Sequence, residues 1–301
     1  MKELKGVVPV VACPFNNDGS VDYESFVAML RHLGSIGCDG LTLFGIAGEY
    51  YKLTDAEQFK LIGLMVDECK RMGIPSVISI TQHATHSAIE RAKYVESQGA
   101  DMLMLLPPFF LKPTSEDLYD HMKAVTKAVS IPVMLQYAPE QTGVALSPAI
   151  FRQLSEEVPN ASYFKIECKP AGPYISSFLK LTNSKTRIFA GNAGYQMIET
   201  FDRGAIGVMP GCSMAELYIK IYNEYFNQNK EGAVKLHNAL LPMLNHIRQN
   251  VEMIIYYEKK ILVKRGIIAS AHCRIPAFRP DDVMEDLFEM YYDSIKRYLE
   301  Q

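Results

Sequence analysis

The sequence carries little net charge and has no block of charge of one sign. Lysine and arginine number 31, and aspartate and glutamate number 34, so the formal net charge is −3. Proteins that bind nucleic acid or anionic lipid through charge present a basic patch or stripe. No run of five or more like charges occurs here. We therefore expect neither a nucleic-acid partner nor a membrane partner.

Long hydrophobic runs are absent as well. The longest apolar run, residues 102–111, contains two prolines and is half the roughly 20 residues that a membrane-spanning helix needs. Near the start, residues 1–5 precede an apolar stretch that Pro9 and Pro14 interrupt, without a clear small-residue cleavage site. We see no export signal and expect a cytoplasmic protein.

Cysteine is sparse and irregularly spaced. The cysteines at positions 13, 38, 69, 168, 212 and 273 fit neither a disulfide framework nor a zinc pattern, so we expect reduced, mainly buried thiols. His83 and His86 stand three residues apart, but no carboxylate or cysteine nearby completes a recognisable set of metal ligands. We expect no metal site.

The chain does contain a regular alternation of apolar segments. Hydrophobic residues make up 48% of its 301 residues and charged residues 22%, as in globular proteins. Eight short apolar runs are each followed by a longer amphipathic stretch; they are residues 7–12, 40–44, 76–81, 102–106, 133–136, 163–167, 187–190 and 205–210. They start 18 to 36 residues apart, about the length of one strand with its crossover helix. The pattern predicts eight parallel strands that alternate with helices.

Signals for helix starts lie between these runs. Residues 54–57 form a capping box, in which the side chains of Thr54 and Glu57 would each bond a free backbone N–H group. Thr85 opens a similar helix. Ser115 opens another, with acidic residues in the first turn, where the helix dipole favours them. These signals support helices in the stretches between the strands.

The order of strands and helices predicts a closed barrel. No G-x-G-x-x-G follows the first strand, which argues against an open doubly wound sheet. We therefore predict an α/β fold, a (β/α)₈ TIM barrel over residues 1–217. From about residue 218 the apolar pattern is helical alone. It predicts a C-terminal helical extension, residues 218–301, packed on the barrel without a flexible linker.

Glycine-rich turns follow two of the predicted strands, at the barrel face where functional residues gather. Gly45 and Gly48 could let a turn point several N–H groups in one direction, as a site for a carboxylate or phosphate. An ordinary tight turn would use the same glycines. Gly191 and Asn192 could likewise hold substrate oxygens, although short βα turns also need glycine.

Lys165 lies in the sixth run. Because alternate strand residues share a face, Tyr163, Lys165 and Glu167 should point together into the barrel. Burial disfavours the ammonium form and leaves more neutral amine, which can attack a carbonyl group and form a Schiff base. Two alternatives stay open: a salt bridge with Glu167, or a shifted register that places Lys165 outside. Gln136 and Tyr137 could orient a substrate or relay a proton, unless Tyr137 only packs.

Four motifs occur in an order that is typical of one enzyme family. Residues 45–49 match G-x-x-G-E, residues 139–143 match P-x-x-T-G, residues 204–207 match G-A-x-G, and Lys165 lies on the sixth strand. The sequence thereby resembles the pyruvate-dependent class I aldolases, which include dihydrodipicolinate synthase, N-acetylneuraminate lyase and the 2-keto-3-deoxy sugar acid aldolases and dehydratases. The similarity covers residues 6–211 and, weakly, the C-terminal helices.

The resemblance carries expectations for the fold, the site and the assembly. It implies a (β/α)₈ barrel with C-terminal helices that usually forms a homotetramer, so we expect a homo-oligomer, either a tetramer or a dimer. Lys165 would form the Schiff base with a 2-oxo acid, without a metal or an organic cofactor. The substrate carboxylate would be held by the backbone of the turn; its residues are Gly45, Ile46, Ala47 and Gly48.

Several positions depart from the family pattern. They are Ile46 and Ala47 in place of hydroxyl residues, Gln136 in place of the relay tyrosine, Gln141 in place of the synthase's arginine, and Phe109 with Phe110 after the fourth strand. These changes argue against authentic dihydrodipicolinate synthesis. A Schiff-base enzyme still needs a base within hydrogen-bond reach, and we predict that Glu167 or Tyr137 replaces the missing tyrosine.

The leading hypothesis is a Schiff-base-forming lyase, an aldolase or dehydratase, that acts on a 2-oxo acid such as a 2-keto-3-deoxy sugar acid. One alternative is a synthase-like condensation of pyruvate with an aldehyde. Another is a non-catalytic barrel that binds a small acid. A phosphate-binding barrel enzyme would fit the glycine-rich loops but would leave Lys165 without a role.

Overall fold

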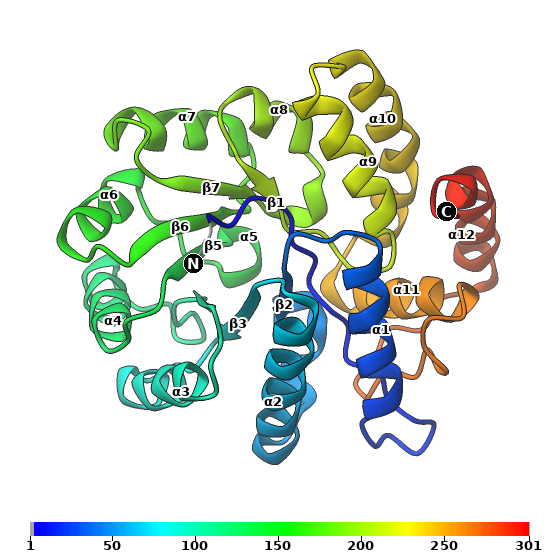
Figure 1. The fold of residues 1–301 in the computed structure, drawn as a ribbon, viewed down its shortest axis with the longest axis horizontal. Helices are drawn as coiled ribbons and strands as arrows, with labels where there is room; N and C mark the ends of the chain where they lie inside the picture. The colour runs from blue at the N-terminus through cyan, green and yellow to red at the C-terminus, as the bar shows by residue number, and fades with distance from the viewer. Residues whose placement is uncertain (1–2, 301) are drawn as a thin grey trace. The chain divides into compact units, whose positions relative to one another are not determined.

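The computed structural model describes residues 3–300, and within them eight strands form one parallel sheet (Figure 1). The strands are β1 (Gly6–Val7), β2 (Leu41–Leu43), β3 (Ser76–Ile80), β4 (Met102–Leu105), β5 (Val133–Tyr137), β6 (Ala161–Ile166), β7 (Arg187–Ala190) and β8 (Gly207–Val208). Each overlaps one of the eight predicted runs, which confirms the runs as strands. The first strand is shorter than predicted, and beyond it Val10 makes isolated bridges to Thr42 and Gly211.

Helices follow the strands in the predicted alternation. They are α1 (Tyr23–Ser35), α2 (Asp55–Met72), α3 (Thr85–Ser97), α4 (Ser115–Lys127), α5 (Pro139–Thr142), α6 (Pro148–Glu157), α7 (Ala171–Leu181), α8 (Met197–Asp202), α9 (Ala215–Phe226), α10 (Lys230–Ile247), α11 (Val251–Lys264) and α12 (Asp282–Ile295). Short 3₁₀ turns are η1 (Ile46–Gly48), η2 (Tyr50–Lys52), η3 (Asn192–Gly194) and η4 (Lys296–Tyr298). The predicted capping box at Thr54 is present, and Thr114 forms a second one at the start of α4.

The strand order is β1-β8-β7-β6-β5-β4-β3-β2. From β2 to β8, strands that are neighbours in the sequence are neighbours in the sheet, whereas β1 and β2 stand at the two ends of the order; each crossover runs through the helices between the strands. This is the connectivity of a TIM-barrel-like fold, and it confirms the predicted fold class.

The chain divides into two compact units. Unit 1 comprises the described part of Met1–Lys5 together with Pro75–Met209. Unit 2 comprises Gly6–Ile74 and the described part of Pro210–Gln301. The boundary that we expect between a barrel ending at residue 217 and an extension starting at residue 218 stays a prediction.

In unit 1, β3 to β8 pair in sequence order as parallel neighbours. On the helix side of β6, the ring of Phe164 contacts Phe151 of α6 and Phe178 of α7, which lie outside these strands in Figure 1. Because side chains alternate along a strand, the neighbours of Phe164 face the other side of the sheet. The aromatic cluster therefore fixes which face of β6 carries Lys165.

In unit 2, helices pack on one another around a buried ion pair. Helix α1 packs against α2, and α10 packs against both α9 and α12. Glu216 of α9 is almost fully buried and accepts a hydrogen bond of 3.0 Å from Arg265, the residue after α11, while His32 of α1 lies 2.9 Å from the same carboxylate. These contacts join three segments that are far apart in the sequence.

The cysteines are free thiols, as predicted, and five of the six are buried. Burial raises the pKa of the Cys13 thiol to about 12 and that of Cys168 to about 11, so these side chains stay protonated at neutral pH. No helix within residues 3–300 combines the length and the apolar character needed to cross a bilayer.

The capping box of α4 generates a first prediction. The hydroxyl of Thr114 accepts a hydrogen bond from the Asp117 N–H, and the Asp117 carboxylate accepts one from the Thr114 N–H. Thr114→Ala should lower the free energy of unfolding by about 1 kcal/mol, measured by urea denaturation. Ser115→Ala, one residue into the helix, is the control and should change it little. Equal losses in the two variants would contradict the cap.

Candidate active site

The carboxyl end of β6 carries a buried lysine beside a carboxylate. Lys165 faces away from the aromatic cluster of Phe164, toward the inner side of the sheet. Its side chain is 4% exposed, and its Nζ lies 3.5 Å from Oε1 of Glu167. Of the two alternatives left open by the sequence, the salt bridge with Glu167 is present and the outward-facing register is not.

Glu167 is held by groups from the two strands beside β6. Its Oε2 accepts a hydrogen bond of 2.5 Å from Nε2 of Gln136, and its Oε1 accepts one of 2.9 Å from the backbone N–H of Asn192. The register of β5 on β6 places Gln136 directly opposite Lys165. The structure therefore brings together four residues that the sequence predicted for the site.

Gln136 also has one buried acceptor that is not used. A carboxylate only accepts hydrogen bonds, so the amide must turn Nε2 toward Glu167 and Oε1 away from it. Within residues 3–300, this buried Oε1 has no hydrogen-bond donor. An unpaired buried polar atom costs about 1–3 kcal/mol. A ligand that donates a hydrogen bond to Oε1 would recover that cost.

The turn after β7 is shaped around Glu167. A Cβ atom at Gly191 would lie 2.1 Å from Cγ of Glu167, so glycine is required there. Asn192 and Ala193 have left-handed φ values of 56° and 52°, which are uncommon for residues other than glycine. This conformation points the Asn192 N–H at the carboxylate. Direct contacts of Gly191 and Asn192 with a substrate stay a prediction.

Tyr137 lies on the opposite face of β5 from Gln136. Its register partner on β6 is Ile166, and its ring stacks on Tyr174 with 4.6 Å between centroids. Burial raises the pKa of the Tyr137 phenol. The structure thus does not bring Tyr137 to Lys165. Of the two groups predicted to replace the family's tyrosine, the one beside the amine is Glu167.

The turn of residues 45–48 belongs to unit 2 and adopts the 3₁₀ conformation of η1. The Gly48 N–H donates to the Gly45 carbonyl group at 2.8 Å. A Cβ atom at Gly45 would lie 2.6 Å from the Val10 side chain, so this glycine is needed for close packing. The first N–H groups of a helical turn have no partner inside the turn, and here they are those of residues 46 and 47. Their binding of a carboxylate stays a prediction.

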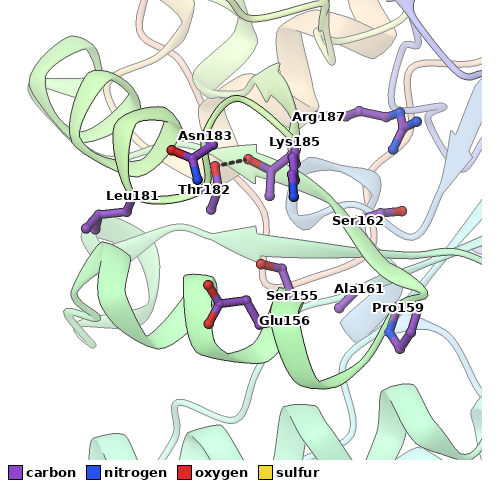
Figure 2. A pocket seen from close by; sticks show the side chains of 11 residues that line it. Ser155, Glu156, Pro159, Ala161, Ser162, Leu181, Thr182, Asn183, Lys185 and Arg187 are labelled. Atoms are coloured by element: carbon purple, nitrogen blue, oxygen red, sulfur yellow. Dashed lines mark hydrogen bonds between the residues drawn. The ribbon is translucent and has the colours of Figure 1, made fainter.

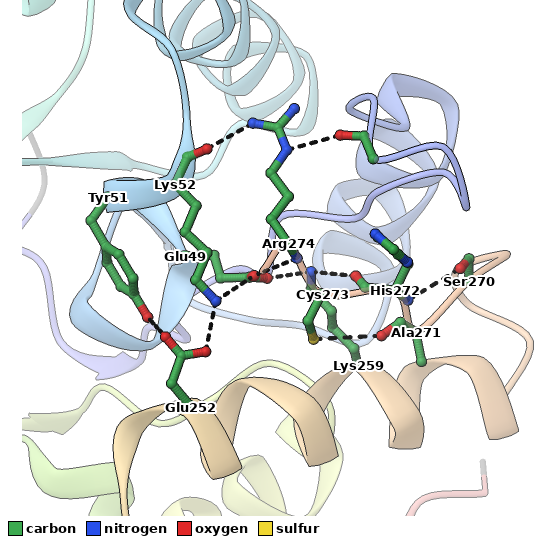
Figure 3. A network of polar contacts seen from close by, with 11 residues as sticks. Glu49, Tyr51, Lys52, Glu252, Lys259, Ser270, Ala271, His272, Cys273 and Arg274 are labelled. Atoms are coloured by element: carbon green, nitrogen blue, oxygen red, sulfur yellow. Dashed lines mark hydrogen bonds and ion pairs between the residues drawn. The ribbon is translucent and has the colours of Figure 1, made fainter. Parts of the chain in front are cut away.

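A charged network around Glu49 was not predicted from the sequence. Figure 3 shows the Glu49 carboxylate bonded to Lys52, to Lys259 and to the backbone N–H of Arg274. The G-x-x-G-E motif singles out Glu49. Lys259 and Arg274, however, follow it by 210 and 225 residues, and no local sequence signal links them to it.

Unit 1 also has a surface cleft of about 370 Å³ (Figure 2). Its lining includes Ala161, the first residue of β6, and Arg187, the first residue of β7. The cleft therefore lies at the amino ends of these strands, away from Lys165. Among the described residues, none of its polar side-chain atoms is both buried and without a partner. We assign no function to it.

The two histidines that are close in sequence make separate contacts. The His83 ring lies 4.8 Å from that of Phe109, and the exposed His86 lies 3.4 Å from Glu90. Within residues 3–300, no three His, Cys, Asp or Glu side chains gather as a metal site would require.

Known proteins similar in sequence share one family. The model of the Dihydrodipicolinate synthetase family matches residues 3–290. The chain is 33% identical to the 4-hydroxy-tetrahydrodipicolinate synthase of Persephonella marina over 189 residues, or 63% of this chain and 64% of that protein. The aligned part is thus slightly under two thirds of that relative. The synthase of Aliarcobacter butzleri is 25% identical over 300 residues, or 98% of this chain and 100% of that protein.

A solved structure shows the same fold. It is that of YagE, a prophage protein belonging to the dihydrodipicolinic acid synthase family from E. coli, in complex with pyruvate. The two chains are 21% identical and give a TM-score of 0.88 over 97% of this chain and 98% of that one. The sequence match over nearly the whole chain and the TIM-barrel-like fold agree, and the chain belongs to the Dihydrodipicolinate synthetase family.

Proposed function

We propose that this protein is a Schiff-base-forming lyase that acts on a 2-oxo acid through Lys165. The observation that carries the proposal is the buried amine of Lys165, whose Nζ lies 3.5 Å from the Glu167 carboxylate. The amine adds to the ketone carbon, and the resulting carbinolamine loses water to form a protonated imine. The complex of YagE with pyruvate, a 2-oxo acid, supports this substrate class.

Glu167 is the group that we assign to proton transfer. A general acid or base must reach the reacting atom directly or through one water molecule, and Glu167 stands beside Nζ of Lys165. The carboxylate first takes a proton from the Lys165 ammonium group, which frees the amine for attack on the ketone. As an acid it then gives that proton to the departing hydroxyl group of the carbinolamine. As a carboxylate it then takes a proton from the carbon next to the imine, which leaves an enamine. Hydrogen bonds from Gln136 and Asn192 fix its orientation in advance.

The free oxygen of Gln136 supports a hydroxylated substrate. Oε1 is buried without a donor among the described residues, and the register places Gln136 opposite Lys165. A hydroxyl group on a substrate bound to Lys165 would supply that donor. This favours a 2-keto-3-deoxy sugar acid over an unsubstituted one. From the enamine, loss of the hydroxyl group on the next carbon would be dehydration. Aldol cleavage would instead start from the protonated imine: the substrate hydroxyl group loses its proton, the carbon–carbon bond beside it breaks, and the enamine of pyruvate is left together with an aldehyde.

The carboxylate of the substrate is assigned to the 45–48 turn. The N–H groups of Ile46 and Ala47 begin the 3₁₀ turn and are free of partners inside it. Such N–H groups attract anions because they carry the positive end of the backbone dipoles. The side chains of Ile46 and Ala47 add no hydroxyl group, so the backbone would make the contacts.

The same residues argue against the synthase reaction. The relatives are named as 4-hydroxy-tetrahydrodipicolinate synthases, but Gln136 and Gln141 stand where the resemblance expects a tyrosine and an arginine. Tyr137, the neighbouring phenol, packs on Tyr174 on the other face of the sheet. A lyase that works with a carboxylate as its proton-transfer group fits the residues present. A homo-oligomer in the cytoplasm stays a prediction.

Borohydride trapping tests the Schiff base directly. Reduction in the presence of pyruvate should attach the substrate irreversibly to Lys165, and peptide mapping by mass spectrometry should find the adduct there. Lys165→Met should abolish the adduct. Lys169→Met is the matched control, because Lys169 lies in the same segment but pairs with Glu140 at the surface. An adduct that persists in Lys165→Met would overturn the proposal.

The role of Glu167 predicts a selective loss of proton transfer. Glu167→Gln should slow the exchange of pyruvate methyl protons with deuterated solvent by about 10²- to 10⁴-fold, followed by NMR. Borohydride should still trap the adduct at Lys165, but more slowly, because the same group assists the loss of water from the carbinolamine. Tyr137→Phe removes a hydroxyl group on the opposite face of β5. In this variant the methyl protons of pyruvate should exchange at nearly the wild-type rate. An exchange rate that falls in Tyr137→Phe and not in Glu167→Gln would reverse the assignment.

Gly191 generates a third test of the same site. In Gly191→Ala the new methyl group overlaps Cγ of Glu167 and must displace the carboxylate. The exchange rate should fall by about 10- to 100-fold, since a displacement near 1 Å can cost that much. Gly63→Ala is the control, because a Cβ atom there meets open space in α2. An unchanged rate in Gly191→Ala would show that the position of Glu167 does not limit proton transfer.

A further inference from the structure

Glu49, the last residue of the G-x-x-G-E motif, is completely buried and fully paired. Its side chain is 0% exposed, and that of Lys259, which binds one of its carboxylate oxygens, is 1% exposed. The other oxygen lies 3.1 Å from Nζ of Lys52 and accepts a hydrogen bond of 3.2 Å from the Arg274 N–H. Two cations and one backbone donor thus converge on a single carboxylate (Figure 3).

Two partners of Glu49 come from α11 and the segment after it, and the third, Lys52, lies in η2 and is held in turn by α11. Glu252 and Lys259 are seven residues apart, which places them on the same face of the helix. Glu252 binds Lys52 at 2.6 Å and also the hydroxyl group of Tyr51, while Lys259 binds Glu49. The face of α11 therefore holds the chain at both ends of the segment 49–52.

Arg274, in the segment after α11, makes further contacts in this network. Its guanidinium group donates to the carbonyl oxygen of Lys52 at 2.7 Å and to the Glu57 carboxylate at 2.8 Å. Lys259 is fixed in turn by the His272 carbonyl oxygen at 2.9 Å. All of these groups belong to unit 2, so the network is internal to that unit.

The anchored residue is also the one that ends the 45–48 turn. Glu49 adopts a left-handed conformation, φ 56° and ψ 20°, between η1 and η2. This region is uncommon for a residue with a Cβ atom, and it persists where the surroundings impose it. The ion pairs of the Glu49 side chain supply that constraint, directly after Gly48.

Stability alone does not explain such a cluster. Charges taken out of water lose their hydration, and a well-packed apolar replacement of a buried ion pair is often neutral or stabilising. A buried carboxylate with three donors does, however, fix the direction of the backbone that carries it. In unit 2, the backbone of Glu49 directly follows the 45–48 turn, so fixing it also fixes the turn that carries the N–H groups of residues 46 and 47.

We propose that Glu49 is a positioning residue that sets the geometry of the 45–48 turn, and that α11 thereby controls the affinity for the carboxylate of the 2-oxo acid. The inference rests on the proposed function, because it takes the turn as the carboxylate site. Glu49 itself touches no substrate atom in this scheme. It acts through the backbone, and Lys259 and Lys52 act through Glu49.

The test compares Glu49→Gln with a second buried carboxylate of unit 2. In each variant, the pyruvate concentration that gives half-maximal borohydride trapping at Lys165 is measured, together with the limiting rate at saturation. Glu49→Gln should raise the half-saturating concentration about 10- to 100-fold, because misplaced binding groups lose affinity on this scale. The limiting rate should stay near that of the wild type, since Lys165 is unchanged.

Glu216→Gln is the matched control. Glu216 is almost as deeply buried, with a side chain that is 3% exposed, and it pairs with Arg265 and His32 instead of with the turn. Its loss should lower the thermal unfolding midpoint but leave the half-saturating concentration of pyruvate unchanged. Equal increases of that concentration in Glu49→Gln and Glu216→Gln would show a general loss of stability and would overturn the proposal. So would an unchanged value in Glu49→Gln.

The double variant Glu49→Gln with Lys259→Met removes one charge of each sign, so the net charge of the cluster is unchanged. It is the variant to measure if Glu49→Gln alone does not fold. Its thermal unfolding midpoint should return most of the way to that of the wild type, while the half-saturating concentration of pyruvate stays raised. Recovery of both quantities together would overturn a positioning role. Absence of any pyruvate adduct in the wild type would overturn the proposed function and this inference with it. An adduct in the wild type with unchanged affinity in the double variant would overturn this inference alone.

Discussion

The contact between Lys165 and Glu167 is the interaction on which the proposed chemistry depends. An amine and a carboxylate, both nearly removed from solvent, lie 3.5 Å apart on one face of β6. Removing one partner of such a buried pair typically costs about 3–5 kcal/mol, so each side chain holds the other in place. In the proposed reaction, the same closeness would let Glu167 exchange protons with atoms bound to the Lys165 nitrogen. One contact would therefore both order the site and serve the proposed reaction.

The residues around Glu167 hold its carboxylate in position beside Lys165. Its carboxylate needs donors where bulk water is absent, and Gln136 and the Asn192 N–H supply them. Gly191 leaves the space that the carboxylate occupies. The amide of Gln136 has two different ends: its nitrogen donates to Glu167, and its oxygen, which has no donor among the described residues, is the proposed contact for a ligand. A tyrosine at this position could not divide these roles in the same way.

In unit 2, the C-terminal helix α11 contacts the segment that directly follows the 45–48 turn. Helix α11 presents Lys259 to Glu49, at the junction between two 3₁₀ turns, and Glu252 to Lys52, at the end of the second turn. Burial of these charges is costly unless each is paired and hydrogen-bonded. Where the pairing is complete, as around Glu49, the result is a backbone held in one conformation. In the proposed function, the 45–48 turn presents its N–H groups to the substrate, and such a constraint would hold them in place.

The sequence by itself determined the alternation of strands and helices, the start of α2 at its capping box, and the shared face of Lys165 and Glu167. It could do so because these features depend on local periodicity and on hydrogen bonds between residues close in the chain. Only the tertiary structure showed that Glu167, and not Tyr137, lies beside Lys165, and only it showed the partners of Glu49. Both depend on strand register and on contacts between residues far apart in the chain, which local patterns do not encode.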